Sequence, residues 1–409
     1  MENNLLNISA TDPVYKYIAE KIVEHIGDEL AKVPAIQLIG ADDYFIHYSV
    51  YPILRDSNED KIMQRVLEFQ KKYMESDEYN KARTLTMLDD EISMIHAIEL
   101  TKRIVEEVRK ELEGMAQNNP QMQEQLEKLM QGVSCGNCTA VSTLSKMISD
   151  IMERSGDRIL QEATRSAKEK AETAKDMKDL LSYGASKSGT SFEKLIDLTQ
   201  KTYLVRFGKA ILTMSKKMVS SMPRFAKIAK MTSKWGDELR GYRLTRKVSD
   251  AIPRDLALPD ELFLTKLVNG FVSREKVLVT EGALYVVIDK SGSMMGEKTV
   301  WARSVALALY RYAIKRRRRY FLRFFDTDVH PDKPLHEPEE ILEHILTIES
   351  DGGTSIDHAI DVAVRDITKR GLSEHTNTII LITDGEDDVA TDPKMLTSNN
   401  ISLVAIMIQ

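Results

Sequence analysis

Short apolar runs alternate with amphipathic segments from about Glu281 to the C-terminus, and this alternation constrains the fold more than any other feature of the chain. The apolar runs have the length of buried strands, and helical segments separate them. Since parallel strands need a crossover, this order is typical of a mostly parallel sheet with helices on its faces. We therefore expect residues 281–409 to form a doubly wound α/β domain. The expected strands are 284–288, 320–325, 378–382 and 402–408, and the expected helices are 297–316, 338–348 and 355–369.

Residues 1–275 have a different pattern of apolar residues and are expected to be helical almost throughout, without strands. Ile62, Val66, Phe69 and Tyr73 recur at the spacing that places side chains on one face of a helix. Small residues near 184–191 indicate a loop or hinge, which is a possible boundary inside this region. The chain is thus expected to be multidomain, with a helical region at 1–275 and the α/β domain at 281–409.

Composition sets broad limits on the class of protein. Of the 409 residues, 42% are apolar and 29% are charged, which describes an ordinary globular protein, and the net charge of −6 is mild. The first residues lack the basic and apolar segments of a signal peptide, and the apolar runs are too short to span a membrane. With two cysteines and no disulfide framework, the expected location is a reducing cytoplasm.

The two cysteines, Cys135 and Cys138, form a C-x-x-C pair between helical stretches. A structural zinc site needs four ligands, and no second cysteine pair supplies them. A thioredoxin-like site needs a βαβ setting, which is also missing here. We interpret the pair as a loop or helix start without chemistry, with a redox-sensitive or intersubunit metal role as the alternative.

The loop after the first α/β strand has the strongest chemical pattern in the chain. It reads Asp289-Lys-Ser291-Gly-Ser293 and offers one carboxylate and two hydroxyls within five residues. Ligands of open α/β sheets bind outside the carboxyl ends of the strands. Oxygen ligands suit a hard cation, so we expect Mg²⁺ first, with Mn²⁺ or Ca²⁺ as alternatives.

Two later loops are expected at the same end of the sheet. Gly352-Gly353-Thr354 offers another hydroxyl, and Asp384, after the third strand, offers a second carboxylate. The sequence therefore predicts a metal site built from Asp289, Ser291, Ser293, Thr354 and Asp384.

This pattern resembles the metal-ion-dependent adhesion site (MIDAS) of the von Willebrand factor A (VWA) family. The resemblance covers about the last third of the chain and implies a Rossmann-like VWA domain. It also implies that one coordination position stays open for a carboxylate of a partner protein. The family fold usually continues through one more strand and a closing helix, so the domain is expected to lack these two elements.

Other polar residues near these loops have simpler interpretations. Asp326 and Asp328 could lie near the metal without binding it directly, but the favoured interpretation is that they form a turn. Glu386, Asp387 and Asp388 either strengthen cation capture or form a solvated loop. The basic run 315–319 is expected to be structural, at the end of a helix. Five of the eight histidines lie beyond residue 329, and none of those five pair at metal-ligand spacing.

The chain as a whole resembles the ViaA and CoxE-like group, in which a helical region precedes a VWA domain. The resemblance rests on Gly241 to Arg246 (GYRLTR), Pro253 and the approach through Tyr285 to Asp289. It implies an adaptor that works with a MoxR-type AAA+ ATPase in the remodelling or maturation of client complexes, and that binds an acidic client or the ATPase through the cation.

Two other classes of function were weighed against this one. An enzyme is not expected, because a dehalogenase-type phosphatase needs a second aspartate where Ser291 stands, and no other catalytic motif occurs. Binding of nucleic acid or an anionic membrane is the alternative, through the basic tract 201–247. That tract has thirteen Lys and Arg against Asp237 and Glu238, interleaved with Tyr203, Phe207, Phe225, Trp235 and Tyr242.

Overall fold

The computed structural model divides the chain into two compact units, Met1–Gln200 and Lys201–Gln409. Each unit is described by itself below. The structure describes residues 6–55, 61–116, 120–135, 137–182, 191–204, 207–219, 229–232, 238–280, 282–370, 377–385, 387 and 389–408.

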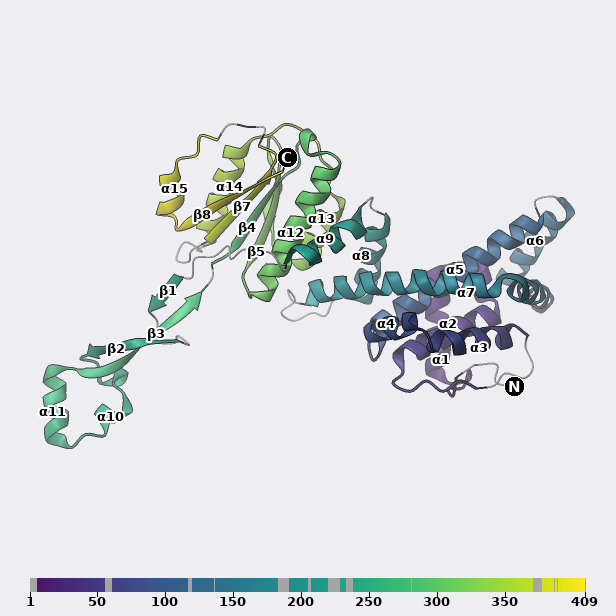
Figure 1. Ribbon diagram of the computed structural model, residues 1–409, viewed down its shortest axis with the longest axis horizontal. Coiled ribbons are helices and arrows are strands. Elements are labelled where there is room, and N and C mark those ends of the chain that lie inside the picture. Colours follow the sequence, from purple (N-terminus) through teal and green to yellow (C-terminus); the bar gives the residue numbers. More distant parts are fainter. Residues whose placement is uncertain are drawn as a thin grey trace. The chain divides into compact units, whose positions relative to one another are not determined.

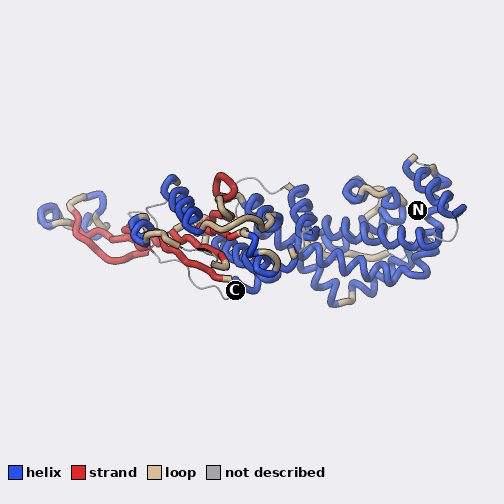
Figure 2. Tube along the Cα trace, turned by 90° about the horizontal axis from the view of Figure 1, so that it is seen from above, coloured by secondary structure: helices blue, strands red, loops and turns tan. Residues whose placement is uncertain are grey.

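The first unit is helical, as the sequence predicts, apart from an isolated bridge between Leu6 and Leu54 (Figure 2). Side-chain caps fix several helix starts; Asp12, for example, accepts a hydrogen bond from the backbone N–H of Val14 at 2.7 Å. The helices are α1 (Pro13–Ile26), α2 (Pro34–Tyr48), α3 (Lys61–Met74), α4 (Asp77–Thr86), α5 (Asp90–Ala116), α6 (Pro120–Ser134) and α7 (Cys138–Ser182), with the 3-10 turn Glu29–Lys32 before α2. Helix α8 (Phe192–Leu204) begins in this unit and ends beyond its last residue, Gln200.

Two long helices, α5 and α7, run side by side and form the centre of this unit (Figure 1). A stripe of fully buried alanines lies along α7, at Ala163, Ala167, Ala171 and Ala174. Their spacing of three or four residues places them on one helix face, and their small size allows a neighbouring backbone to approach closely. The same buried core also contains side chains of α2, α3 and α5.

The second unit contains a mixed five-stranded sheet with the order β6-β5-β4-β7-β8. Strand β4 is central and pairs in parallel with β5 and β7, in register at Leu284 with Tyr320 and with Thr378. All side chains of β4, β5 and β7 are buried, as expected for strands covered on both faces. The strands are β4 (Leu284–Asp289), β5 (Tyr320–Phe325), β6 (Val329–Leu335), β7 (Asn377–Thr383) and β8 (Ile401–Met407).

Helices cover both faces of this sheet, so the α/β expectation for this region is confirmed (Figure 1). Helix α12 (Glu297–Lys315) and α13 (Pro338–Thr347) lie on one face, with α9 (Gly208–Val219) packed on α12. On the other face, α14 (Ile356–Lys369) and α15 (Pro393–Ser398) share a core with alternate residues of the strands, such as Tyr285 and Val287.

Two elements of this domain were missed from sequence. Strand β6 runs antiparallel to β5 at one edge, and its polar sequence, VHPDKPL, lacks an apolar run because most of its side chains are exposed or half-buried. Helix α15 has only six residues, too few for a periodic pattern. At the other edge, the half-exposed β8 ends at Met407.

The expectation of no strands before residue 275 is wrong. A second, antiparallel sheet has the order β1-β3-β2 and comprises β1 (Ala229–Thr232), β2 (Glu238–Thr245) and β3 (Phe271–Thr280). The 3-10 turn Val248–Asp250, α10 (Pro253–Leu256) and α11 (Asp260–Asn269) connect β2 to β3. Burial in β3 alternates with period two, since Phe271 and Ser273 are buried and Arg274 is exposed. Polar and charged residues interrupt the apolar positions of these strands, as in ELRGYRLT, so no long apolar run marks them in the sequence.

None of the described helices combines the length and the apolar character that crossing a bilayer requires. The expected loop near 184–191 falls on residues 183–190, which lie outside the described residues.

Candidate functional site

The predicted metal loop begins where the central strand ends. Asp289 is the last residue of β4, and its side chain is almost completely buried, at 2% exposure. The backbone then turns through Lys290 and Ser291 into a 3-10 turn at Gly292–Met294, and α12 follows. A buried carboxylate at this position must have polar partners, because an unpaired buried charge is strongly unfavourable.

The oxygens of this loop converge. One carboxylate oxygen of Asp289 accepts a hydrogen bond from the backbone N–H of Ser291 at 2.8 Å. The hydroxyl oxygens of Ser291 and Ser293 lie 3.1 Å apart. A separation of about 3 Å is the spacing of neighbouring oxygens around a Mg²⁺ ion with ligands at about 2.1 Å. The donors of the loop therefore fit a small, hard cation.

The loop that carries Thr354 is tied directly to the Asp289 loop. The N–H of Gly292 donates to the carbonyl of Gly352 at 3.0 Å, and the N–H of Asp351 donates to the carbonyl of Lys290 at 2.6 Å. Gly352 has φ +94°, and a Cβ there would meet the Cβ of Asp326 at 3.1 Å, so glycine allows this approach. Thr354 is half-buried two residues later.

The last residue of β7 is a further functional residue that could not be recognised from the sequence. The hydroxyl of Thr383 donates to the second carboxylate oxygen of Asp289 at 2.6 Å and accepts from the N–H of Gly385 at 3.1 Å. Thr383 thus orients the carboxylate of Asp289 from behind. The only sequence feature that pointed to Thr383 was its position at the end of the strand that pairs with β4.

Asp384 follows Thr383 and pairs with a lysine of α12. The ammonium of Lys298 lies 3.0 Å from a carboxylate oxygen of Asp384, whose side chain is 2% exposed. We call Asp289, Ser291, Ser293, Thr354 and Asp384 the rim cluster. Hydrogen bonds join the Asp289 loop to the loops of Thr354 and Thr383, while the assignment of these five residues as metal ligands stays a prediction.

The turn after β5 confirms the structural interpretation of Asp326. Its carboxylate accepts from the N–H of Asp328 at 2.8 Å and forms an ion pair with Lys290, and His330 lies 3.4 Å away. Partial burial raises the pKa of Asp326, but the hydrogen bonds from Lys290 and Asp328 outweigh it and hold the pKa below its usual value. Asp326 also binds the neighbouring loop, because its carbonyl accepts from the N–H of Ser355.

Two other polar groups have structural roles. Asp387 accepts a hydrogen bond from the N–H of Ile356 at 2.9 Å, at the start of α14, while Glu386 and Asp388 lie outside the described residues. In the basic run 315–319, Arg318 is buried and donates to the carbonyls of Gly282 and Ala283. Arg318 thus has a structural role, but it anchors the start of β4 rather than the end of the helix, and the other four residues of the run are exposed.

A cleft opens beside the metal loop. Met295 and Thr299 line it from the start of α12, Ser350 from the loop after α13, and Phe207 and Ile211 from the region of α9. Thr299 and Ser350 share a hydrogen bond of 2.8 Å across one wall. Arg303 also lines the cleft; burial lowers its pKa to about 10, against the opposing charge of Glu349, so the guanidinium stays protonated at neutral pH.

The cysteine pair has the ordinary setting favoured from sequence. Cys135 lies in the turn after α6, and Cys138 is the first residue of α7. Both thiols are free and exposed. Neither belongs to a cluster of metal-ligating side chains within the part of the chain that the structure describes.

Comparison with known proteins identifies the sheet domain. Residues 284–386 match the family model of the von Willebrand factor type A domain. An uncharacterized protein of Methanocaldococcus jannaschii is 25% identical over 38% of each chain, and another from the same organism is 32% identical over 27% of each chain. A putative VWFA domain-containing protein of Acidianus two-tailed virus is 32% identical over 33% of this chain and 16% of its own length.

These matches fix one domain of the chain. Residues 284–386 form a VWA domain, and domains of this type commonly mediate protein interactions. The matched segments span well under half of each relative.

Proposed function

We propose that this protein is a metal-dependent interaction adaptor without catalytic activity of its own. In this proposal the rim cluster binds a divalent cation, Mg²⁺ first and Mn²⁺ or Ca²⁺ as alternatives. The bound cation then accepts a carboxylate from an acidic partner protein.

The convergence of buried oxygens at the end of β4 carries this proposal. Asp289 is fixed on both carboxylate oxygens, by Thr383 and by the N–H of Ser291, while the hydroxyls of Ser291 and Ser293 adjoin each other. Fixed oxygen donors lose little freedom when an ion binds, so they favour binding. An ion held there would lie outside the carboxyl ends of the central strands, where the loops meet solvent.

The local charge balance favours an acidic partner. Asp289 and Asp384 carry two negative charges, which balance a divalent ion when both bind it directly. Lys298, 3.0 Å from Asp384, adds a positive charge next to the ion. The loaded site would therefore have a net charge of about +1, which attracts a carboxylate.

The cleft beside the metal loop gives a partner segment room to lie. Its walls combine apolar side chains such as Met295 and Phe207, both exposed, with the cationic Arg303. An acidic residue on the ion and an apolar neighbour in the cleft would form a small two-point contact. We propose that this contact is made with a MoxR-type AAA+ ATPase or its client, as the resemblance to the ViaA and CoxE-like group implies.

The test is capture of a co-resident MoxR-type ATPase by the full chain, with Mg²⁺ and with a chelator. Asp289→Asn keeps the size of the side chain and removes the charge that holds the ion. Asp328→Asn is the matched control, because Asp328 is an exposed acid on the neighbouring loop. We expect capture to need Mg²⁺, to disappear in Asp289→Asn and to persist in Asp328→Asn.

Equal capture under all these conditions would show that the ion is not the contact. Binding of Mn²⁺ to the isolated full chain, measured by titration calorimetry, separates the two parts of the proposal. If Mn²⁺ binds and Asp289→Asn abolishes it while no ATPase is captured, the metal site stands and the partner is wrong.

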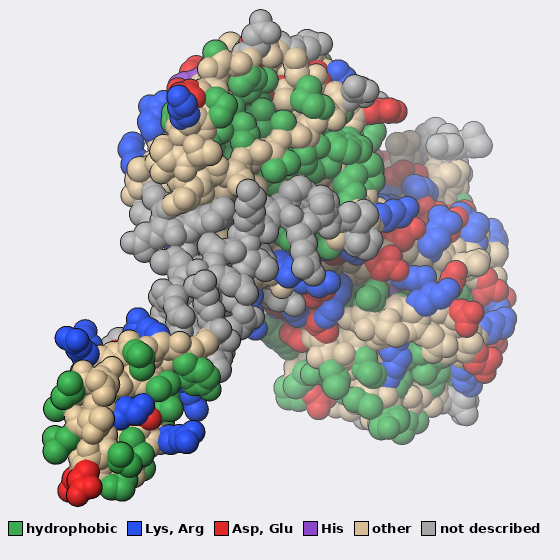
Figure 3. Space-filling model, turned by 60° about the vertical axis from the view of Figure 1, so that its left-hand side comes forward, with side chains coloured by type: hydrophobic (Ala, Val, Ile, Leu, Met, Phe, Trp, Pro, Cys, Tyr) green, Lys and Arg blue, Asp and Glu red, His purple; other side chains and the backbone are tan. Residues whose placement is uncertain are grey.

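The exposed basic residues of the β2 region favour one alternative, binding of nucleic acid or an anionic membrane. Arg243, Arg246 and Lys247 are exposed beside Tyr242 and Leu244, which are 62% and 70% exposed (Figure 3). Of the other aromatic residues in the basic tract, Phe207 is exposed, and Phe225 and Trp235 lie outside the described residues. Salt-sensitive binding of RNA or anionic vesicles would support this alternative, and no binding at low salt would remove it.

A further inference from the structure

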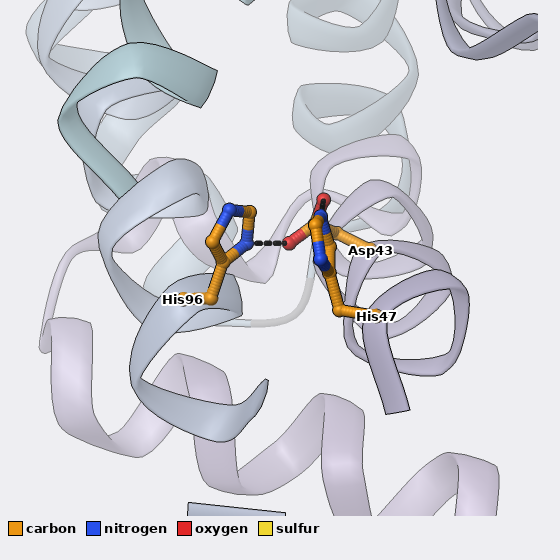
Figure 4. A group of neighbouring side chains, drawn as sticks. All are labelled: Asp43, His47 and His96. Atoms are coloured by element: carbon orange, nitrogen blue, oxygen red, sulfur yellow. Dashed lines mark hydrogen bonds and ion pairs between the residues drawn. The ribbon is translucent and has the colours of Figure 1, made fainter. Parts of the chain in front are cut away.

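Three ionisable side chains meet inside the helical unit, in a place where the sequence gives no metal motif. Asp43 and His47 lie one turn apart on α2, and His96 faces them from α5 (Figure 4). A spacing of four residues places Asp43 and His47 on the same helix face. Relative exposures are 4% for Asp43 and 0% for both histidines. We call these three residues the core cluster.

The carboxylate of Asp43 lies between the two imidazoles. One of its oxygens is 2.7 Å from Nδ1 of His96, and the other is 3.8 Å from Nε2 of His47. One candidate ligand atom from each residue lies within 4.8 Å of the other two. On the far side of the His47 ring, Nδ1 lies 3.2 Å from the hydroxyl of Thr86, which leaves Nε2 directed toward Asp43.

The contact between Asp43 and His47 is too long for a hydrogen bond but suits two ligands of one ion. Around a tetrahedral ion with ligands at about 2.0–2.1 Å, neighbouring ligand atoms are roughly 3.3 Å apart. A small rotation of the Asp43 carboxylate would adjust both of its contacts toward this spacing. The geometry therefore requires little rearrangement to hold an ion.

Several buried polar atoms here have no hydrogen-bond partner among the described residues. They are Nε2 of His47, Nε2 of His96 and the hydroxyl of Tyr73. Buried polar groups are almost always satisfied, so Nε2 of His47, which faces Asp43, is the atom here that calls for a ligand. An ion bound by Nε2 of His47 and Nδ1 of His96 would satisfy the first of these atoms and replace the long contact to Asp43.

We propose that Asp43, His47 and His96 bind a divalent transition-metal ion, Zn²⁺ as the first choice, which links α2 to α5 inside the helical unit. Two imidazoles and one carboxylate form a borderline-soft ligand set, unlike the oxygen-only rim cluster. These side chains supply three of the four ligands that zinc usually takes, so a water molecule would complete the shell. Because the cluster is buried, the ion would stabilise the unit rather than act on a substrate. The bundle core between facing helices is a common place for such sites.

The test is zinc retention by the full chain. Protein freed of metal by a chelator is mixed with Zn²⁺ in the presence of excess Mg²⁺, passed over a desalting column and analysed by mass spectrometry for bound zinc. We expect about one zinc per chain. Asp43→Asn and His96→Gln should each lower the zinc affinity at least about tenfold.

Two control variants locate the ion. Asp289→Asn alters the rim cluster, and the double change Cys135→Ser with Cys138→Ser removes both thiols. Both controls should retain zinc if the core cluster holds it. Zinc retained by His96→Gln but lost from the cysteine variant would overturn the proposal, and so would failure of the unaltered chain to retain zinc.

Cobalt spectroscopy keeps the proposal testable even if a variant fails to fold. Co²⁺ bound to the unaltered chain should give visible ligand-field absorption without the charge-transfer band of a thiolate ligand. A thiolate band would place the ion at the cysteines instead. No ligand-field absorption on adding Co²⁺ would show that the core cluster is only a hydrogen-bonded group. None of these outcomes depends on the adaptor role proposed above.

Discussion

The rim cluster and the core cluster each contain a buried carboxylate, but the partners of the two carboxylates come from different distances along the sequence. At the rim, Asp289 receives its hydrogen bonds from Ser291, two residues away, and from the end of the neighbouring strand. In the helical unit, Asp43 meets His96, which is 53 residues away on another helix. The rim is therefore assembled mainly by one loop, while the core cluster exists only because two helices pack. This difference decides how visible each site is in a sequence.

A second contrast between the two units lies in how a buried carboxylate is neutralised. Glu99 on α5 has a side chain that is 5% exposed, and it accepts from Lys170 at 2.7 Å and from Ser166 at 2.9 Å. Asp384 at the rim is equally buried, but its partner Lys298 is 34% exposed. In our proposal a metal ion supplies the remaining charge at Asp384, whereas at Glu99 only side chains do.

The largest expected effect tests this contrast directly. Lys170→Met leaves the buried Glu99 with Arg103, 3.0 Å away, as its remaining cation, so we expect a loss of about 2 kcal/mol in the free energy of unfolding. Lys298→Met, measured with Mg²⁺ present, should cost less than about 1 kcal/mol if the proposed ion neutralises Asp384. Urea unfolding followed by circular dichroism measures both. Similar losses for the two variants would mean that the rim depends on its lysine as the helical unit does.

An intermediate effect is expected from Thr383→Val. This change removes the hydroxyl that orients Asp289 while keeping the shape of the side chain. Loss of such an orienting group typically lowers metal affinity by about 10- to 100-fold. Mn²⁺ titration calorimetry measures the change.

Thr378→Val is the matched control for that prediction. Thr378 is a buried threonine at the opposite end of the same strand, where its hydroxyl contacts Arg318. It should leave the Mn²⁺ affinity unchanged. If both variants lowered the affinity equally, Thr383 would act through strand stability and not through Asp289.

The smallest expected effect concerns acid sensitivity in the helical unit. Burial raises the pKa of Glu99, but Lys170, Ser166 and Arg103 outweigh it and leave the pKa below the ordinary value of 4.5. A carboxyl whose folded pKa is lowered stabilises the fold above its unfolded pKa, and this contribution disappears as the pH falls through the folded value. Stability should therefore decline below about pH 4.5, and Glu99→Gln should make the decline shallower.

Glu193→Gln provides the comparison for this pH series. Glu193 is an acid of the same unit with a side chain that is 68% exposed. Its variant should follow the unaltered chain from pH 6 to pH 3, when unfolding is monitored by circular dichroism at each pH. An equally shallow decline in both variants would show that total charge, rather than the Glu99 contacts, sets the acid sensitivity.

The α/β domain could be predicted closely because its elements carry strong local patterns. Strand β4 and helix α12 differ from the expected bounds by one residue, since a run of apolar residues and a 19-residue helix leave little choice. Strands β1 to β3 could not be predicted in the same way. Their formation depends on antiparallel pairing between segments up to about 50 residues apart, such as Ala229 with Thr280.

The residues of the candidate site differ in the same way: those in local motifs could be predicted, and those that depend on tertiary contacts could not. Asp289, Ser291 and Ser293 could be predicted because one loop contains all three. Thr354 and Asp384 could be predicted because their loops follow the same strand–loop–helix order. Thr383 and Lys298 were missed, since nothing in a lone threonine or lysine indicates which carboxylate it contacts. The core cluster could not be predicted either, because Asp43 and His47 on α2 form no metal motif by themselves and their partner His96 lies on another helix.

The sequence by itself determined the helical character of the first unit, the α/β domain and the loop that presents Asp289, because helix periodicity, apolar runs and a five-residue motif are local properties of the chain. Only the tertiary structure decided which side chains surround a buried charge. Packing α2 against α5 brings His96 to Asp43, and pairing β7 with β4 brings Thr383 to Asp289. The physical reason is that a buried polar group needs a hydrogen-bond partner. That partner comes from the element that packs against it, and the packing depends on the whole chain.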